Sequence, residues 1–207
     1  MRKFGFLSAL LCGWLLLAGC NNNSLNNPEI IIEETGNVVI SDDVSMVNDT
    51  EGNKSLVIYF SPTGHTKQMA TFISEIIDSD ITEIVPVTWY TTEDLNWRDE
   101  TSRTFTEFKN PDIRPELSIE TTFDWYDTIY LWYPIWFGIT PNIILTLLDN
   151  YGEALAGKNI ALFCTSEHVW IENSVEYLSW YNLNVIWSHR FAQDATIEDV
   201  QAWLESL

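Results

Sequence analysis

The sequence predicts an α/β protein in which helices cover both faces of a five-stranded parallel sheet, making a three-layer sandwich. Two observations lead to this fold class. Short apolar runs, the length of buried strands, alternate along the chain with segments whose apolar residues recur at helical spacing. Strands that alternate with helices form parallel sheets, because each helix carries the chain back to the start of the next strand. The chain has 207 residues, 46% of them hydrophobic, which is enough for one domain with its own core.

The first twenty residues have the pattern of an export signal. Arg2 and Lys3 precede an apolar run over residues 4–17, which is shorter than a transmembrane helix normally requires. The run ends in Leu-Ala-Gly-Cys, which resembles a bacterial lipobox and implies lipid attachment at Cys20. A plain signal peptide cut elsewhere and an uncleaved anchor are the alternatives. We predict a lipoprotein signal peptide over residues 1–20 and a lipid-anchored protein at the outer face of the cell membrane.

Residues 21–54 are rich in Asn, Glu, Asp and Ser, a composition typical of a polar, acidic tether. The whole chain has 30 Asp+Glu against 10 Lys+Arg, a formal net charge of −20. This charge excludes nucleic acid as a partner and leaves the lipid as the means of membrane attachment, because anionic surfaces repel an acidic protein. A protein partner should present a basic face. Residues 55–207 contain no repeat and no second linker, so we predict one folded domain there.

The first half of this domain is predicted to begin with a strand over residues 56–60, which leads through a loop into a helix over residues 67–77. A second strand is predicted over residues 81–87. The stretch 88–122 is polar, with aromatic residues dispersed among charges. We predict that it is loop apart from one helix near residues 95–108.

The next pair of elements is a strand over residues 127–133 and a helix that runs to about residue 151. Pro141 suits the first position of this helix, and Thr140 is a plausible N-cap. A fourth strand over residues 159–164 follows, and Gly157 marks the turn before it.

The chain is predicted to end with a helix near residues 171–181, a strand near 184–188 and a last helix that ends near Leu204. Thr196 is the expected cap of the last helix. Two acidic residues lie in its first turn, where the helix dipole favours negative charge.

The loop after the first strand, residues 61–66, predicts a phosphate site. It reads Ser-Pro-Thr-Gly-His-Thr, so hydroxyls and backbone N–H groups gather at the positive end of a helix dipole. Gly64 allows the backbone to turn tightly beside a ligand. The glycine-rich motifs of nucleotide and dinucleotide loops are absent, and neutral donors suit a terminal phosphate monoester. An ordinary strand-to-helix turn with good caps is the alternative.

Two further loops are expected to converge on the same place. In a parallel sheet the ligand lies beyond the carboxyl ends of the strands, at the point where the winding reverses. The third strand ends at Pro134 and the fourth at Thr165, and each is followed by an unusual sequence. The sequence therefore predicts one site built by the loops after three strands.

The residues of these loops carry a family resemblance. Residues 59–66, followed by Ala70, resemble the phosphate loop of flavodoxins, and residues 126–129, 133–138 and 155–166 extend the agreement. Together these segments resemble the flavodoxin-like domains found in many bacterial lipoproteins and small flavin reductases. The resemblance implies a sheet of strand order 2-1-3-4-5 and noncovalently bound FMN.

The resemblance also implies which residues bind the cofactor, in three groups. The phosphate group would lie against Ser61, Thr63, Gly64, His65 and Thr66, the ring against Pro134, Ile135, Trp136, Phe137 and Gly138, and the other ring edge against Thr165, Ser166 and Glu167. Trp136 is the expected stacking face, and an ordinary core or surface aromatic is the alternative. This chain departs from the family after Ser166, where Glu-His-Val-Trp-Ile-Glu replaces a glycine-rich stretch.

The implied function is electron transfer by FMN, with a basic redox protein or a membrane quinone as partner. Two alternatives stay open: an NAD(P)H-dependent flavin or quinone reductase, and a flavodoxin-like binding module that has lost FMN. The glycine-free segment after Ser166 favours the second of these. No catalytic acid or base is predicted, because the chemistry would belong to the flavin. No metal site is predicted, because the histidines are scattered and the folded part has no pair of cysteines. Cys164, the one cysteine of the folded part, is expected to be a buried strand-end residue.

Overall fold

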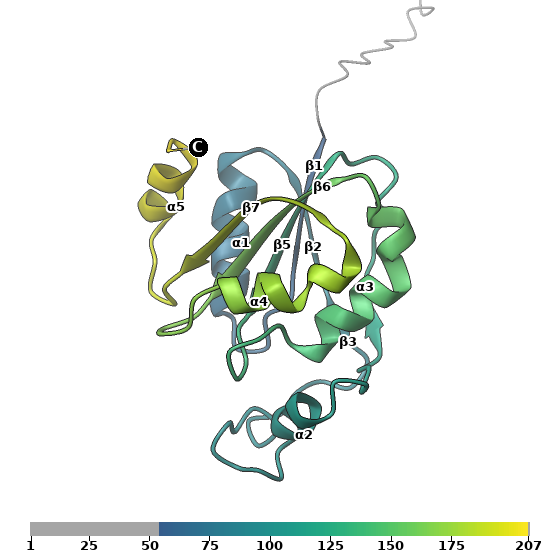
Figure 1. The fold of residues 1–207 in the computed structure, drawn as a ribbon. Helices are drawn as coiled ribbons and strands as arrows, with labels where there is room; N and C mark the ends of the chain where they lie inside the picture. The colour runs from purple at the N-terminus through teal and green to yellow at the C-terminus, as the bar shows by residue number, and fades with distance from the viewer. Residues whose placement is uncertain (1–53, 207) are drawn as a thin grey trace, which may run out of the picture. The chain divides into compact units, whose positions relative to one another are not determined.

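The computed structural model describes residues 54–206. The predicted signal peptide, its lipobox Cys20 and nearly all of the tether lie outside this range. The core of the described part is a parallel sheet with the strand order β2-β1-β5-β6-β7 (Figure 1). Counted along the chain, these five strands have the order 2-1-3-4-5, so the predicted fold class is confirmed.

The elements follow one another as the alternating pattern requires. They are β1 (Ser55–Tyr59), α1 (His65–Ile76), β2 (Asp80–Glu83), β3 (Val85–Pro86), α2 (Arg103–Lys109), β4 (Leu117–Ser118), β5 (Thr128–Pro134), α3 (Asn142–Leu155), β6 (Asn159–Thr165), α4 (Glu172–Tyr177), the 3₁₀ turn η1 (Ser179–Tyr181), β7 (Asn184–Phe191) and α5 (Ile197–Leu204). None of these helices combines the length and apolarity that a bilayer crossing requires.

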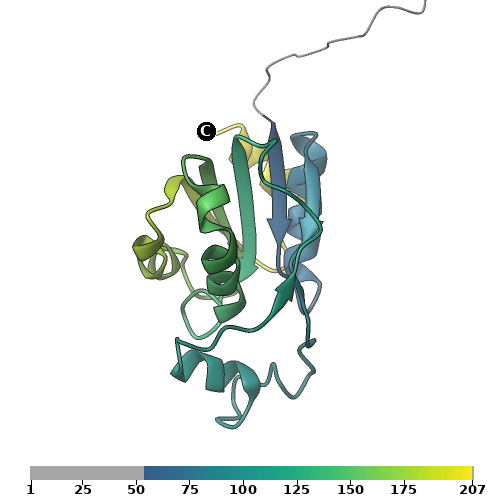
Figure 2. The same cartoon turned by 90° about the vertical axis from the view of Figure 1, so that its right-hand side faces the viewer.

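The sheet is buried on both faces, because successive side chains of a strand point to opposite sides. On β1, Leu56 belongs to the core under α3 and α4, whereas Val57 belongs to the core under α1 and α5. Figure 2 shows α1 and α3 on opposite sides of the sheet. The central strands β1, β5 and β6 are buried almost throughout, as their continuous apolar sequences predict.

The predicted second strand is wrong in its second half. β2 ends at Glu83, and Val85–Pro86 pairs instead with Leu117–Ser118 as a separate antiparallel ribbon. The predicted strand is therefore divided between two sheets, which a single apolar run does not reveal. The long segment between β3 and β4 lies beyond the carboxyl ends of the central strands (Figures 1 and 2).

Helix ends differ from prediction where side-chain bonding decides them. α2 begins at Arg103 rather than near residue 95, because the Ser102 hydroxyl caps it by accepting the N–H of Phe105 at 3.3 Å. Thr140 does not cap α3: its Oγ1 lies 2.5 Å from Ser174 Oγ instead. The predicted cap of α5 is confirmed, and Thr196 forms a complete capping box with Asp199.

The last predicted helix–strand pair also differs in its bounds. The expected helix over residues 171–181 divides into α4 and the 3₁₀ turn η1. Asn182 follows η1 in the left-handed conformation (φ 49°). β7 extends three residues beyond the expected Ser188, to Phe191. This extension matters for the site, because Arg190 and Phe191 lie beside the carboxyl end of β6.

Candidate functional site

A cavity of about 410 Å³ lies at the carboxyl ends of β5 and β6. Its size is within the usual range for small-molecule sites. Eight of the predicted cofactor residues line it: Thr63, Pro134, Ile135, Trp136, Phe137, Thr165, Ser166 and Glu167. The structure thus brings together one residue of the first predicted loop, four of the second and three of the third. The remaining predicted residues, Ser61, Gly64, His65, Thr66 and Gly138, lie in the same two turns but do not line the cavity.

Six residues that the sequence did not predict complete the lining: Leu95, Trp97, Thr104, His168, Val169 and Gln193. The first three come from the segment between β3 and β4, which has little regular structure and no periodic signal. Trp97 is 63% exposed. Its position among charged residues is the sequence signal that could have marked it as a candidate site residue. His168 and Val169 directly follow the predicted Glu167.

The loop before α1 has the geometry of an anion site. Ser61 Oγ accepts the N–H of Lys67 at 2.9 Å, and Gly64 O accepts the N–H of Gln68 at 3.1 Å. Within residues 54–206, the N–H groups of His65 and Thr66 have no acceptor. Two backbone donors are therefore left at the positive end of the α1 dipole. The first turn of α1 carries no acidic residue that would repel an anion.

Gly64 makes this geometry possible. It precedes α1 with φ 92°, in the left-handed region that other residues avoid. Apart from the glycine and its two chain neighbours, no heavy atom lies within 4 Å of the position that a Cβ would occupy there. The glycine is thus needed for its backbone conformation rather than for space.

The hydroxyl of Thr66 makes a hydrogen bond within the protein. Its Oγ1 lies 2.6 Å from Thr165 Oγ1, and both side chains are buried. The bond joins the start of α1 to the end of β6. Consequently, the backbone of Thr66 is better placed than its hydroxyl to meet a ligand.

The second loop is a tight hairpin that presents Trp136. Trp136 and Ile139 exchange backbone hydrogen bonds of 3.0 and 3.1 Å. The two residues between them, Phe137 and Gly138, have φ values of 50° and 85°, as a type I′ turn requires. Phe137 is an uncommon residue at positive φ, and its ring stacks on Phe108 of α2 at 4.8 Å. The packing of α2 therefore helps to hold this turn.

Trp136 is half-buried and contacts the core on one side. Its ring meets Phe60 edge-on at 5.5 Å and Tyr90 edge-on at 5.1 Å. Since it also lines the cavity, the indole forms a fixed wall between the core and the cavity.

The third loop contains no glycine, and Arg190 binds it. Arg190 Nη1 donates to the Ser166 carbonyl at 2.5 Å, and the guanidinium carbon lies 4.9 Å from the centre of the Trp170 ring. The N–H of Ser166 donates to the Phe191 carbonyl at 3.1 Å, and Ser166 Oγ accepts the N–H of Val169 at 3.0 Å. The backbone amide of Ser166 is thus committed within the protein.

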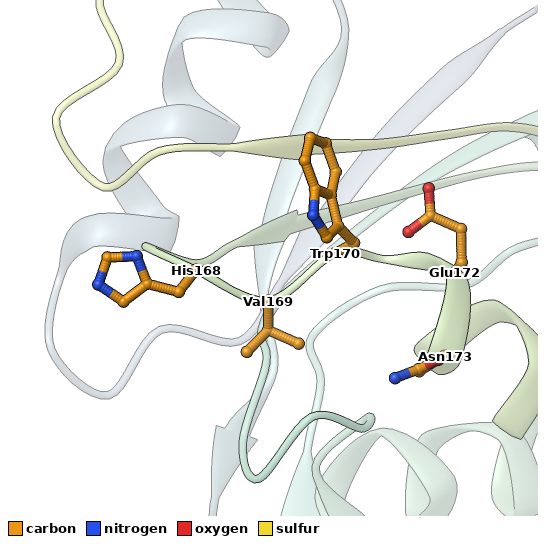
Figure 3. Close-up of a pocket in the computed structure, with 5 residues that line it drawn as sticks. All are labelled: His168, Val169, Trp170, Glu172 and Asn173. Carbon is orange, nitrogen blue, oxygen red and sulfur yellow. The ribbon is translucent and has the colours of Figure 1, made fainter.

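A second, open hollow of about 640 Å³ adjoins the cavity and shares His168 and Val169 with it. Figure 3 shows Val169 and Trp170 pointing to opposite sides of the loop and His168 pointing away from both. These three side chains do not converge on one point.

Cys164 is a buried residue at the end of β6, as predicted. Burial raises the pKa of its thiol to about 12, although Arg190 acts in the opposite direction. The thiol is therefore neutral at physiological pH and unsuited to nucleophilic or redox chemistry. Residues 54–206 contain no cluster of His, Cys, Asp and Glu that could hold a metal ion.

The chain is similar to several solved flavoproteins. A flavoprotein from Bacteroides uniformis is 36% identical, with a TM-score of 0.68 over 74% of this chain and 99% of that one. A flavoprotein from Bacteroides eggerthii is 31% identical, with a TM-score of 0.67 over 75% and 98%. A Lactobacillus acidophilus flavoprotein solved in complex with FMN is 28% identical, with a TM-score of 0.58 over 74% and 99%.

No curated protein sequence matches the chain significantly. The family model described as flavodoxin matches residues 54–207, which is the whole domain predicted from the sequence. With this match, the strand order and the relatives above, the chain belongs to the flavodoxin family.

Proposed function

We propose that this protein binds FMN noncovalently and transfers electrons through it. The observation that carries the proposal is the convergence of the three loops. Two unpaired N–H groups at the start of α1 suit the phosphate, and the adjoining cavity bordered by Trp136 suits the ring. The similar flavoprotein solved with FMN supports this cofactor.

Each part of the chain has a distinct task in this proposal. FMN, when bound, supplies the redox chemistry. The start of α1 binds the phosphate, Trp136 orients the ring, and the Ser166 loop, held by Arg190, borders its edge. No side chain needs to act as an acid or a base.

The place of action follows from the N-terminal sequence. We propose that Cys20 carries a lipid and holds the domain at the outer face of the cell membrane, where a basic redox protein or a membrane quinone would exchange electrons with it. Replacing Cys20 with Ala should abolish incorporation of a labelled fatty acid and release the protein from the membrane fraction. Unchanged labelling would contradict the anchor.

FMN titration tests the cofactor directly. The purified protein should quench flavin fluorescence saturably and shift the visible flavin absorption, because the ring leaves water for an aromatic cavity. If millimolar FMN leaves the spectrum unchanged, the proposal is wrong.

Two other functions are alternatives, and one of them has specific support. A binding module without FMN is favoured by the glycine-free loop, in which the Ser166 amide is already committed to Phe191. The titration distinguishes it from the main proposal. A nicotinamide-dependent quinone reductase is the second candidate, and steady-state NADH oxidation with added quinone would reveal it. The net charge of −20 opposes the approach of NADPH.

A further inference from the structure

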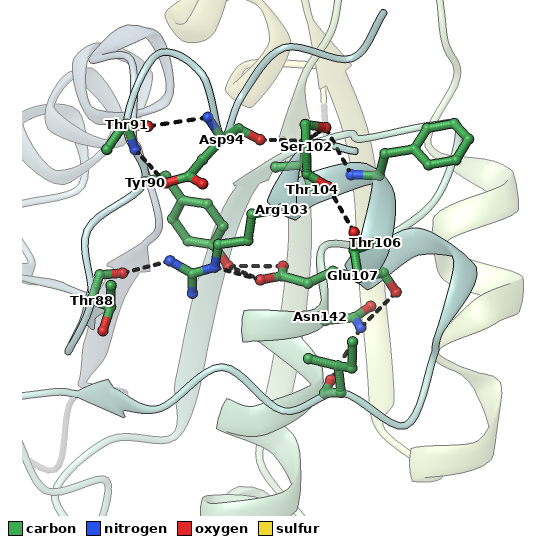
Figure 4. Close-up of polar contacts among 12 residues, drawn as sticks. Thr88, Tyr90, Thr91, Asp94, Ser102, Arg103, Thr104, Thr106, Glu107 and Asn142 are labelled. Carbon is green, nitrogen blue, oxygen red and sulfur yellow. Dashed lines mark hydrogen bonds and ion pairs between the residues drawn. The ribbon is translucent and has the colours of Figure 1, made fainter. Parts of the chain in front are cut away.

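A largely buried polar cluster lies behind the wall that Trp136 forms. It consists of Tyr90, Arg103 and Glu107, all from the segment between β3 and β4 (Figure 4). None of the three lines the 410 Å³ cavity. Nevertheless, two routes of contact connect the cluster to that cavity.

Glu107 is the centre of this cluster. It is 4% exposed, and its carboxylate accepts the Tyr90 hydroxyl at 2.9 and 3.2 Å and Arg103 Nε at 2.8 Å. Charge-assisted hydrogen bonds to a buried carboxylate are stronger than neutral ones and fix the geometry of their donors. The Glu107 carboxylate therefore fixes the position of the Tyr90 ring.

Arg103 closes the cluster from the opposite side. Its guanidinium carbon lies 3.8 Å from the centre of the Tyr90 ring, and its Nη1 donates to the Thr88 carbonyl at 2.7 Å. Tyr90 is thus held at its hydroxyl by Glu107 and on its ring by Arg103. A ring held at two points has little freedom to move.

The first route to the cavity runs through Tyr90. Its ring contacts Trp136 edge-on, with centroids 5.1 Å apart and an interplanar angle of 69°. Phe60 supports the same indole from the core at 5.5 Å. The orientation of the Trp136 ring therefore depends on the position of the Tyr90 ring.

The second route runs through α2. Thr104, next to Arg103, lines the cavity and donates its hydroxyl to the Asp94 carbonyl at 2.7 Å. At the other end of the helix, Asn142 Nδ2 donates to the Glu107 carbonyl at 3.0 Å and so joins α2 to α3. Since Arg103 and Glu107 also join α2 to Thr88 and Tyr90, the helix that carries Thr104 is fixed on one side of the cavity.

From these contacts we infer that Glu107 and Tyr90 are positioning residues, which set the angle of the Trp136 face against the flavin ring. The inference rests on the proposed function, because it requires that FMN binds in this cavity. It assigns a role in cofactor binding to a buried carboxylate that does not contact the cofactor.

The test compares Tyr90→Phe and Glu107→Gln with Tyr126→Phe, all in the full chain purified in detergent. Tyr126 also donates its hydroxyl to a carboxylate, that of Asp80 at 2.7 Å, but lies outside the cavity. We expect the Kd for FMN to rise roughly threefold to thirtyfold in the first two variants, which lies within the range for coupled neighbours. Tyr126→Phe should leave it unchanged, although it also loses a hydrogen bond.

A double-mutant cycle separates positioning from general destabilisation. In a Trp136→Ala background, Tyr90→Phe should cause no further loss of FMN affinity, since the wall that it positions is gone. Equal losses with and without Trp136 would overturn the inference, as would an unchanged Kd in Tyr90→Phe. Failure of the proposed function is distinct, because the unaltered protein would then not bind FMN at all.

Discussion

The Oγ1 atoms of Thr66 and Thr165 lie 2.6 Å apart, although 99 residues separate them in the chain. This bond ties the first turn of α1, where the phosphate is proposed to bind, to the end of β6, where the ring edge is proposed to lie. Both hydroxyls are buried, so each depends on the other for its hydrogen bond. This hydrogen bond therefore fixes the two ends of the proposed FMN site relative to each other.

Replacing Thr165 with Val should destabilise the fold by about 1–3 kcal/mol, because the Thr66 hydroxyl is then buried without a partner. Urea unfolding measures the loss. Thr165→Ser keeps a hydroxyl and is the matched control. A loss of stability in Thr165→Ser without a loss in Thr165→Val would show that the methyl group, and not the hydrogen bond, carries the stability.

Replacing Trp136 with Ala should weaken FMN binding by about 1–3 kcal/mol, by analogy with the stacking of bases on aromatic side chains. Fluorescence titration with FMN measures the change. Trp180, which is 91% exposed and lies outside the cavity, gives the control Trp180→Ala. An unchanged affinity would remove Trp136 from the site.

Trp97 should behave differently from Trp136, since it lines the cavity but is largely exposed. Trp97→Ala is expected to weaken FMN binding while the unfolding midpoint stays the same, because little packing is lost. Trp89→Ala removes a 53% exposed tryptophan of the same segment that does not line the cavity, and should affect neither quantity. Equal affinities for both variants would contradict a role for Trp97.

Glu107 should make stability depend on pH. Burial raises the pKa of its carboxyl, more than the bonds from Tyr90 and Arg103 lower it. The unfolded chain therefore loses this proton at a lower pH than the folded protein does. Consequently, the contribution to stability is fully present below the ordinary pKa of a glutamate and is lost as pH rises through the folded-state pKa.

Urea unfolding of the unaltered protein and of Glu107→Gln from pH 4.5 to 7.5 tests this sign. The stability of the unaltered protein, measured relative to the glutamine variant, should fall as pH rises. A relative stability that increases with pH would mean that the ion pair with Arg103 outweighs burial.

Cys164 should be inert in the folded protein, because burial keeps its thiol neutral. In a chain without the signal peptide and with Cys20→Ala, it is the one remaining cysteine. A thiol reagent at pH 8 should label it only after denaturant is added. Rapid labelling of the native protein would show that the end of β6 opens readily.

Several features of the fold could be predicted because they depend on local chemistry. The buried strands are continuous apolar runs, the α5 cap is a Thr with an acidic partner three residues on, and the phosphate loop is a run of small and hydroxylated residues. The boundaries that failed were set by distant partners. Ser174 binds the hydroxyl of Thr140, and the strand β4 takes Val85 and Pro86 away from the main sheet.

The sequence alone determined the succession of the five main-sheet strands and their helices, the three loops of the site and the acidic character of the chain, because each is encoded in neighbouring residues. Only the tertiary structure decided which side chains meet. It brought Trp97 to the cavity, placed Arg190 under a loop that lacks glycine, and joined Glu107 to Trp136 through Tyr90. These contacts join residues from distant parts of the chain, so their geometry is fixed by the packing of whole elements and leaves no periodic pattern in the sequence.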